Sequence, residues 1–139
     1  MASKTYSGNC LCGEIAFSIE GEPFHFVICH CSNCKQSGGG AFQANGFFKP
    51  QQVNLTKGRD VVKDYVDANT KSGKSITRSF CPNCGTSLFI TPTASGIAIV
   101  HVANIKGSEN WVPKKESFAE SRCSWIKEIE LLSKKQSKL

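Results

Sequence analysis

The residues best suited to chemistry lie in the segment Cys29-His30-Cys31-Ser32-Asn33-Cys34. Its three cysteines follow an apolar stretch at spacings of two and three residues, so a turn here would point all three sulfurs at one ion. Zinc suits thiolate ligands, and three protein ligands leave the fourth tetrahedral position free for water or substrate. We therefore predict that Cys29, Cys31 and Cys34 form a catalytic zinc site.

The residues that follow the third cysteine are candidates for holding a substrate. They are Ser37, Gly38, Gly39 and Gly40. Glycine lets backbone N–H groups approach a ligand closely, because no side chain lies in the way. We predict substrate binding here from position alone.

A second group of cysteines indicates a structural metal site. In the knuckle Cys81-Pro82-Asn83-Cys84-Gly85, proline and glycine shape the turn and N–H groups can point at the thiolates. A redox dithiol is the alternative for this motif. Cys10 and Cys12 can supply the two missing ligands. We predict a structural zinc held by Cys10, Cys12, Cys81 and Cys84, hence two zinc ions per chain, of which the three-cysteine ion is the more labile.

The elements that must position these cysteines are short strands. Apolar and polar residues alternate over 14–20, 53–56 and 75–80, and turn residues separate the segments. No helical period is evident, so we expect an all-β fold of antiparallel sheets with little helix.

Two connections between strands are predicted. Residues 14–20 and 24–28 would form an antiparallel hairpin, which places Cys12 and Cys29 at the same end. Asn45-Gly46 is typical of a tight hairpin turn.

Several other residues receive a structural interpretation. His30 alternates away from its neighbouring cysteines, which favours support of the site over ligation. His25 and His101 lie in apolar strands, where a structural histidine is the expectation. Cys123 lacks partner spacing and is expected to be a free thiol, while Trp125 is expected in the core or a pocket wall.

Length and composition predict one domain. The 139 residues form a domain over 1–139, with a core at about 5–126 and a charged tail at 127–139. There is no apolar run of about 18 residues, so no membrane association is expected. The net charge of +6 is spread without a basic and aromatic stripe, so we expect no nucleic-acid partner. No secretory signal is evident, which favours an intracellular protein with thiols and metal ligands among its eight cysteines.

The last three residues are Ser137-Lys138-Leu139. This tripeptide is a peroxisomal address in eukaryotes, so we predict recognition by the peroxisomal import receptor if the source is eukaryotic, and a cytoplasmic location otherwise.

Four motifs resemble the glutathione-dependent formaldehyde-activating (GFA) family, which includes centromere protein V. They are Gly8-Asn9-Cys10-Leu11-Cys12-Gly13, Cys29-His30-Cys31-Ser32-Asn33-Cys34, Phe80-Cys81-Pro82-Asn83-Cys84-Gly85 and Ser121-Arg122-Cys123-Ser124-Trp125. The resemblance implies a β-tent with two zinc sites, in agreement with the grouping of cysteines above.

The resemblance also implies an activity. GFA proteins join glutathione and formaldehyde into S-hydroxymethylglutathione, so we expect a zinc-dependent carbon–sulfur lyase or synthase acting on a glutathione–aldehyde adduct. The alternative is a non-catalytic zinc-binding interaction module, as in centromere protein V relatives. A redox or zinc-buffering role of the thiolates is a third hypothesis.

Overall fold

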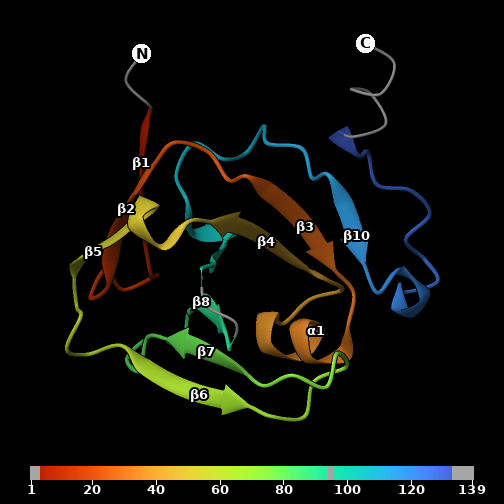
Figure 1. Ribbon diagram of the computed structural model, residues 1–139, viewed down its shortest axis with the longest axis horizontal. Coiled ribbons are helices and arrows are strands. Elements are labelled where there is room, and N and C mark those ends of the chain that lie inside the picture. Colours follow the sequence, from red (N-terminus) through yellow and green to blue (C-terminus); the bar gives the residue numbers. More distant parts are fainter. Residues whose placement is uncertain (1–3, 94–95, 133–139) are drawn as a thin grey trace.

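The computed structural model describes residues 4–93 and 96–132, which form two β-sheets and one short α-helix (Figure 1). Almost all neighbouring strands are antiparallel. The prediction of an all-β, β-tent-like fold with little helix is therefore confirmed.

The smaller sheet has three strands in the order β1-β2-β5. These strands are β1 (Thr5–Asn9), β2 (Ala16–Glu20) and β5 (Val53–Lys57). The alternation read from the sequence explains the central strand, because Phe17 and Ile19 of β2 are buried on one face.

The larger sheet has seven strands in the order β10-β3-β4-β9-β8-β7-β6. They are β3 (His25–Cys29), β4 (Gln43–Phe48), β6 (Lys63–Asp67), β7 (Ile76–Phe80), β8 (Ser87–Pro92), β9 (Ala98–His101) and β10 (Lys115–Ser117). Only β10 pairs in parallel, with β3, among the described residues. Among the described residues, two 3-10 turns connect strands, at Pro50–Gln52 and Val102–Asn104, and a third follows β10 at Ala119–Ser121.

The main core lies between the two sheets. Phe17 and Ile19 from the small sheet meet Phe48, Leu88 and Val100 from the large one. These five side chains are almost completely buried, so this contact joins the two sheets.

The helix α1 (Ser32–Gly38) directly follows β3. Cys31 is its N-cap, whose sulfur accepts a hydrogen bond from the Cys34 N–H, and Gly39 ends it in a left-handed conformation at φ 72°. In Figure 1 the helix lies beside β4 and above β6 and β7. Because α1 follows β3 directly, the helix encloses one side of the site at the end of β3.

Two predicted connections are wrong. Strands β2 and β3 belong to different sheets, so residues 14–20 and 24–28 form no hairpin, because β2 pairs instead with β1 and β5. Asn45-Gly46 lies inside β4, where a Cβ on Gly46 would be 3.0 Å from Phe48 and 3.3 Å from Val102. Close packing, not a turn, is the reason for this glycine.

Residues 127–132 lie against the large sheet. Ile129 packs against Phe26, Ile28 and Val102, and the Leu132 N–H donates to the Pro113 carbonyl at 2.7 Å.

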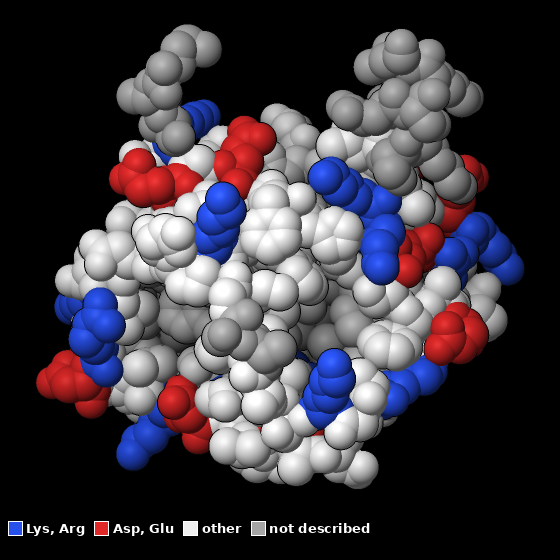
Figure 2. All heavy atoms as spheres, viewed as in Figure 1, with Lys and Arg blue, Asp and Glu red and all other residues white. Residues whose placement is uncertain are grey.

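The predicted signal Ser137-Lys138-Leu139 lies outside the described residues. Within the part of the chain that is described, no helix has the length and apolar character of a membrane span. On the face shown in Figure 2, basic and acidic side chains are dispersed and intermixed.

Candidate metal centres and adjoining pocket

Cys10, Cys12, Cys81 and Cys84 form a four-cysteine cluster in which all sulfurs lie within 4.8 Å of one another. The Cys12 sulfur is 3.7 Å from those of Cys10 and Cys81. Tetrahedral zinc with Zn–S bonds of about 2.3 Å separates its sulfurs by about 3.8 Å. The four thiols therefore have a spacing that suits one metal ion.

Backbone groups support the four-cysteine cluster from both of its loops. The Ile15 N–H donates to the Cys10 sulfur at 3.3 Å, and the Cys84 N–H donates to the Cys81 sulfur at 3.5 Å. A hydrogen bond from Thr86 lowers the pKa of Cys84 to about 5. The cluster joins the loop before β2 to the loop before β8, so it links two segments that are far apart in the sequence.

Cys29, Cys31 and Cys34 form a second, three-cysteine cluster. Cys29 ends β3, Cys31 caps α1 and Cys34 lies in its first turn, so the change from strand to helix brings the sulfurs together. All three side chains are buried, and the Cys29 and Cys31 sulfurs are 3.4 Å apart. No other histidine, cysteine or carboxylate in the described ranges joins this group. A metal here would have three protein ligands.

The three-cysteine cluster favours one thiolate even without a metal. The side-chain interaction with Cys29, together with the nearby charge of Arg78, lowers the pKa of Cys34 to about 6 against the opposing effect of burial. The same interaction raises the pKa of Cys29. Negative charge is therefore concentrated on the Cys34 sulfur, on which the charge of Arg78 acts.

A loop from the C-terminal part of the chain covers the three-cysteine cluster. Phe118 packs against it with its backbone in a left-handed conformation at φ 55°. Lys35 Nζ donates to the Ser121 carbonyl at 2.6 Å, and Lys71 Nζ donates to the Ser121 hydroxyl at 2.7 Å. These hydrogen bonds hold the loop that contains Phe118 and Ser121 in place against the three-cysteine cluster.

His30 points away from the cluster, as the alternation predicted. It is completely buried, and its Nε2 donates to Glu116 Oε1 at 2.8 Å. The other oxygen of Glu116 accepts from Arg122 Nη2 at 2.8 Å. Glu116 thus joins the motif at Cys29–Cys34 to the motif at Ser121–Trp125, while Trp125 itself is 70% exposed, contrary to the expectation of a core or wall residue.

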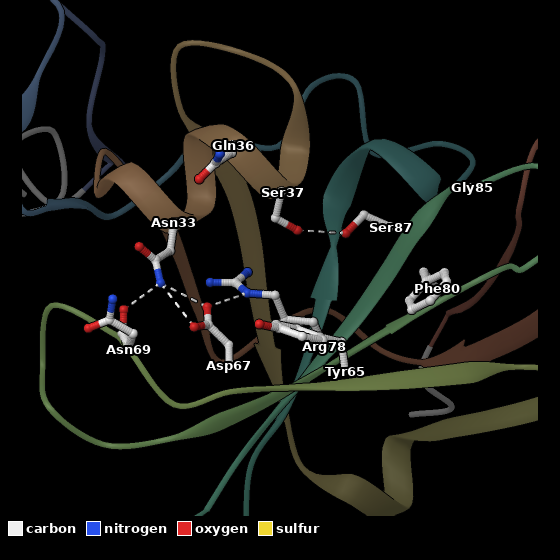
Figure 3. Close-up of a pocket in the computed structure, with 10 residues that line it drawn as sticks. All are labelled: Asn33, Gln36, Ser37, Tyr65, Asp67, Asn69, Arg78, Phe80, Gly85 and Ser87. Atoms are coloured by element: carbon white, nitrogen blue, oxygen red, sulfur yellow. Dashed lines mark hydrogen bonds and ion pairs between the residues drawn. The ribbon is translucent and has the colours of Figure 1, made fainter.

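A pocket of about 450 Å³ lies beside the three-cysteine cluster, between α1 and strands β6 to β8 (Figure 3). We call it the arginine pocket, and it is lined by Asn33, Gln36, Ser37, Tyr65, Asp67, Asn69, Arg78, Phe80, Gly85 and Ser87. The Arg78 Nε donates to Asp67 Oδ2 at 2.9 Å, and Asn33 donates to both oxygens of Asp67 at 2.9 and 3.1 Å. Asn33 of α1 thus orients the Asp67 carboxylate, which in turn orients the Arg78 guanidinium.

Asp67 and Arg78 each favour the charged form of the other in the arginine pocket, despite their burial. Burial alone would raise the pKa of Asp67, but the hydrogen bonds from Asn33 and Arg78 outweigh it and lower that pKa. Burial opposes the charge on Arg78 as well, yet Asp67 and Cys34 raise the pKa of the guanidinium. Arg78 Nη1 is buried and has no hydrogen-bond partner among the described residues, although Cys34 acts on the charge of the same guanidinium.

Among the four predicted substrate residues, only Ser37 lines the arginine pocket. Ser37 lines the arginine pocket and shares a 3.3 Å hydrogen bond with Ser87. The N–H groups of Gly39 and Gly40 donate to the Lys35 carbonyl at 2.8 and 3.2 Å. These two amides close the end of α1 and are already engaged. Sequence reasoning did not find Asp67 or Arg78. Arg78 lies within the alternating segment 75–80, and Asp67 follows a strand-like segment, but neither residue had a local signal of function.

The two sheets and two cysteine clusters define an all-β protein with candidate metal centres. The sequence pattern of the family described as "Glutathione-dependent formaldehyde-activating enzyme" matches residues 5–121, and the chain belongs to this GFA family.

Known proteins are similar to the chain over much of its length. A protein of Schizosaccharomyces pombe named as an uncharacterized lyase is 30% identical over 106 residues, which is 76% of this chain and 72% of that protein. A Halomonas elongata protein provisionally named glutathione-dependent formaldehyde-activating enzyme is 28% identical over 87 residues, 60% of this chain and 54% of that protein. A crystal structure of a Rhodobacter sphaeroides protein has the same fold, with a TM-score of 0.58 and 19% identity, over 73% of this chain and 88% of that one.

Proposed function

We propose that this protein is a zinc-dependent carbon–sulfur lyase or synthase that acts on a glutathione–aldehyde adduct, with S-hydroxymethylglutathione as the first candidate. The observation that carries the proposal is a buried three-cysteine cluster next to a pocket with an arginine whose Nη1 has no hydrogen-bond partner in the described chain. The family's description and the names of the two relatives support this class of chemistry.

Zinc is the metal we assign to both clusters. The sulfur spacings of 3.4 to 3.7 Å, the burial of the three-cysteine cluster and the N–H groups that face the sulfurs all fit it. Cys10, Cys12, Cys81 and Cys84 would hold a structural ion, and Cys29, Cys31 and Cys34 the catalytic one. Bound zinc supplies an open coordination position that lowers the pKa of a substrate thiol.

Arg78 is our candidate for binding a carboxylate of the substrate. Its Nε is engaged by Asp67, which fixes the plane of the guanidinium, while Nη1 has no hydrogen-bond partner within residues 4–93 and 96–132. Glutathione carries two carboxylates and a thiol, so an anchored carboxylate would direct the sulfur toward the cluster. Ser37 lies on the opposite wall and remains a candidate substrate contact (Figure 3).

The reaction balances without an oxidant or reductant. In the synthase direction the thiol sulfur bonds to the aldehyde carbon, and the thiol proton ends on the former carbonyl oxygen as a hydroxyl. In the lyase direction the same bond breaks and the proton returns to sulfur. The chain's contribution would be to align thiol and aldehyde and to limit the water around them.

The proposal is tested by the rate of exchange between glutathione, formaldehyde and their adduct, measured by NMR, because the uncatalysed reaction already reaches the same equilibrium. We expect the metal-loaded protein to accelerate exchange and Arg78→Met to raise the glutathione concentration needed for half the maximal rate. Exchange at the uncatalysed rate would contradict an enzyme and leave a non-catalytic zinc module as the function to test.

A further inference from the structure

We propose that a second hollow, next to the arginine pocket, binds an uncharged hydrogen-bond donor, either an amide N–H or a hydroxyl, through His101 and Gln43. This hollow has a volume of about 480 Å³, and we call it the histidine hollow. Its lining includes Leu11, Ser37, Gly38, Gln43, Ser87 and His101. It lies between a loop of the four-cysteine cluster and the end of α1, and it shares Ser37 and Ser87 with the arginine pocket.

His101 lines this hollow and carries a buried acceptor atom. Its side chain is buried, and its Nδ1 lies 2.9 Å from Asn45 Oδ1, the residue opposite it on β4. An amide oxygen only accepts, so Nδ1 carries the proton. Burial, helped by the charge of Arg78, lowers the pKa of His101 to about 4, so the ring is neutral near pH 7. Nε2 is then an acceptor, and it is buried without a hydrogen-bond partner in the described part of the chain.

Gln43 offers a second acceptor. It lies two residues before Asn45 and thus on the same face of β4. A Cβ on Gly38 would be 3.0 Å from Gln43 Nε2, so the bare backbone of α1 leaves room for this amide. Gln43 is 6% exposed, and its Oε1 is buried without a partner. Two neighbouring polar side chains therefore each bury an acceptor that nothing in the described chain satisfies.

The groups around the histidine hollow favour an uncharged ligand over a charged one. A carboxylate carries no donor and would face two acceptors, while a cation would experience the charge of Arg78 that already acts on His101. Leu11, Phe42 and Ala103 give the rest of the wall apolar surface. A neutral amide or hydroxyl group satisfies the acceptors at the least cost of desolvation.

The test uses the full, metal-loaded chain and NMR of the His101 ring nitrogens, with acetamide, ethylene glycol and acetate as probes. We expect acetamide or ethylene glycol to move the Nε2 signal toward that of a hydrogen-bonded nitrogen, and acetate to leave it unchanged. The comparison of the two neutral probes separates amide from hydroxyl recognition. An equal shift with acetate, or no shift with any probe, would overturn the proposal.

Gln43→Met is the matched variant, since it keeps the length of the side chain and removes the acceptor. We expect it to weaken binding of the effective probe about fivefold to tenfold and to leave the urea midpoint of unfolding unchanged or higher, because the lost oxygen had no partner. A lower midpoint with unchanged probe binding would show that Oε1 is satisfied inside the protein, and the proposal would fail. None of these probes contains a thiol or aldehyde, so the outcome is independent of the proposed reaction.

Discussion

The Arg78 Nε donates to Asp67 Oδ2 at 2.9 Å, and both side chains are at most 10% exposed. The pair joins β6 to β7 across a pocket that adjoins the three-cysteine cluster. A buried charge without its partner is costly, so each of these residues requires the other. This relationship sets both the stability of the pocket and the direction of the Arg78 guanidinium.

Asp67→Asn should destabilise the protein by roughly 2–3 kcal/mol, because it leaves the Arg78 charge buried with a weaker partner. Urea unfolding at pH 7 measures this change. Asp64→Asn is the control, since Asp64 lies on the same strand but is exposed, and the asparagine oxygen can still accept the hydrogen bond from Ser79. It should cost less than about 1 kcal/mol. Equal effects of the two substitutions would contradict the importance of the buried pair.

The stabilisation by Asp67 should depend on pH in a defined direction. Its pKa in the folded protein is below the ordinary value of 3.8, so the folded state binds this proton less readily than the unfolded state does. The stabilisation is complete above about pH 4 and is lost as the pH falls through the folded pKa. The difference in unfolding free energy between wild type and Asp67→Asn should therefore be constant from about pH 5 to 7 and shrink below about pH 4. A difference that stays constant down to pH 3 would contradict the lowered pKa.

Local patterns predicted the strands and the grouping of cysteines in the structure. Alternation identified β2, because Phe17 and Ile19 pack on one face while the other face is more exposed. It also identified β7, although the neighbouring residues Arg78 and Ser79, on opposite faces of that strand, are both buried. The spacing of Cys10, Cys12, Cys81 and Cys84 identified the four-cysteine cluster, because metal ligands must converge.

Relationships set by the sheets could not be predicted in the same way. The Asn45-Gly46 pair has the chemistry of a turn but lies in a strand, since Phe48 and Val102 occupy the space that a Cβ would need. The contact of Arg78 with Asp67 depends on the register of β6 against β7, which neither residue encodes locally. The pocket was missed for this reason.

Removing one ligand from the four-cysteine cluster should unfold the chain. A structural zinc can contribute on the order of 10 kcal/mol, so Cys84→Ser should lose the circular dichroism signal of the folded protein at 25 °C. Cys123→Ser is the control, because Cys123 belongs to neither cluster, and it should change stability by less than about 0.5 kcal/mol. A folded Cys84→Ser protein of normal stability would contradict the structural role.

Gly8→Ala should also be strongly destabilising. A Cβ at this position would lie against the Phe17 ring and the Asn104 carbonyl, where the two sheets meet. We expect a cost of about 1–3 kcal/mol in thermal or urea unfolding. Gly40→Ala, whose Cβ would approach only the Phe42 carbonyl at 3.8 Å, should change stability by no more than about 0.5 kcal/mol. If both variants lose the same stability, the close contact at Gly8 is not the cause.

The most direct test of the central claim is the zinc content of the intact protein, measured by native mass spectrometry for wild type and Cys31→Ser with and without glutathione. We predict two zinc ions in the wild type and one in a still-folded Cys31→Ser protein, with glutathione binding only to the wild type. A wild-type protein that holds a single zinc ion and does not bind glutathione would contradict a thiol-handling site at Cys29, Cys31 and Cys34.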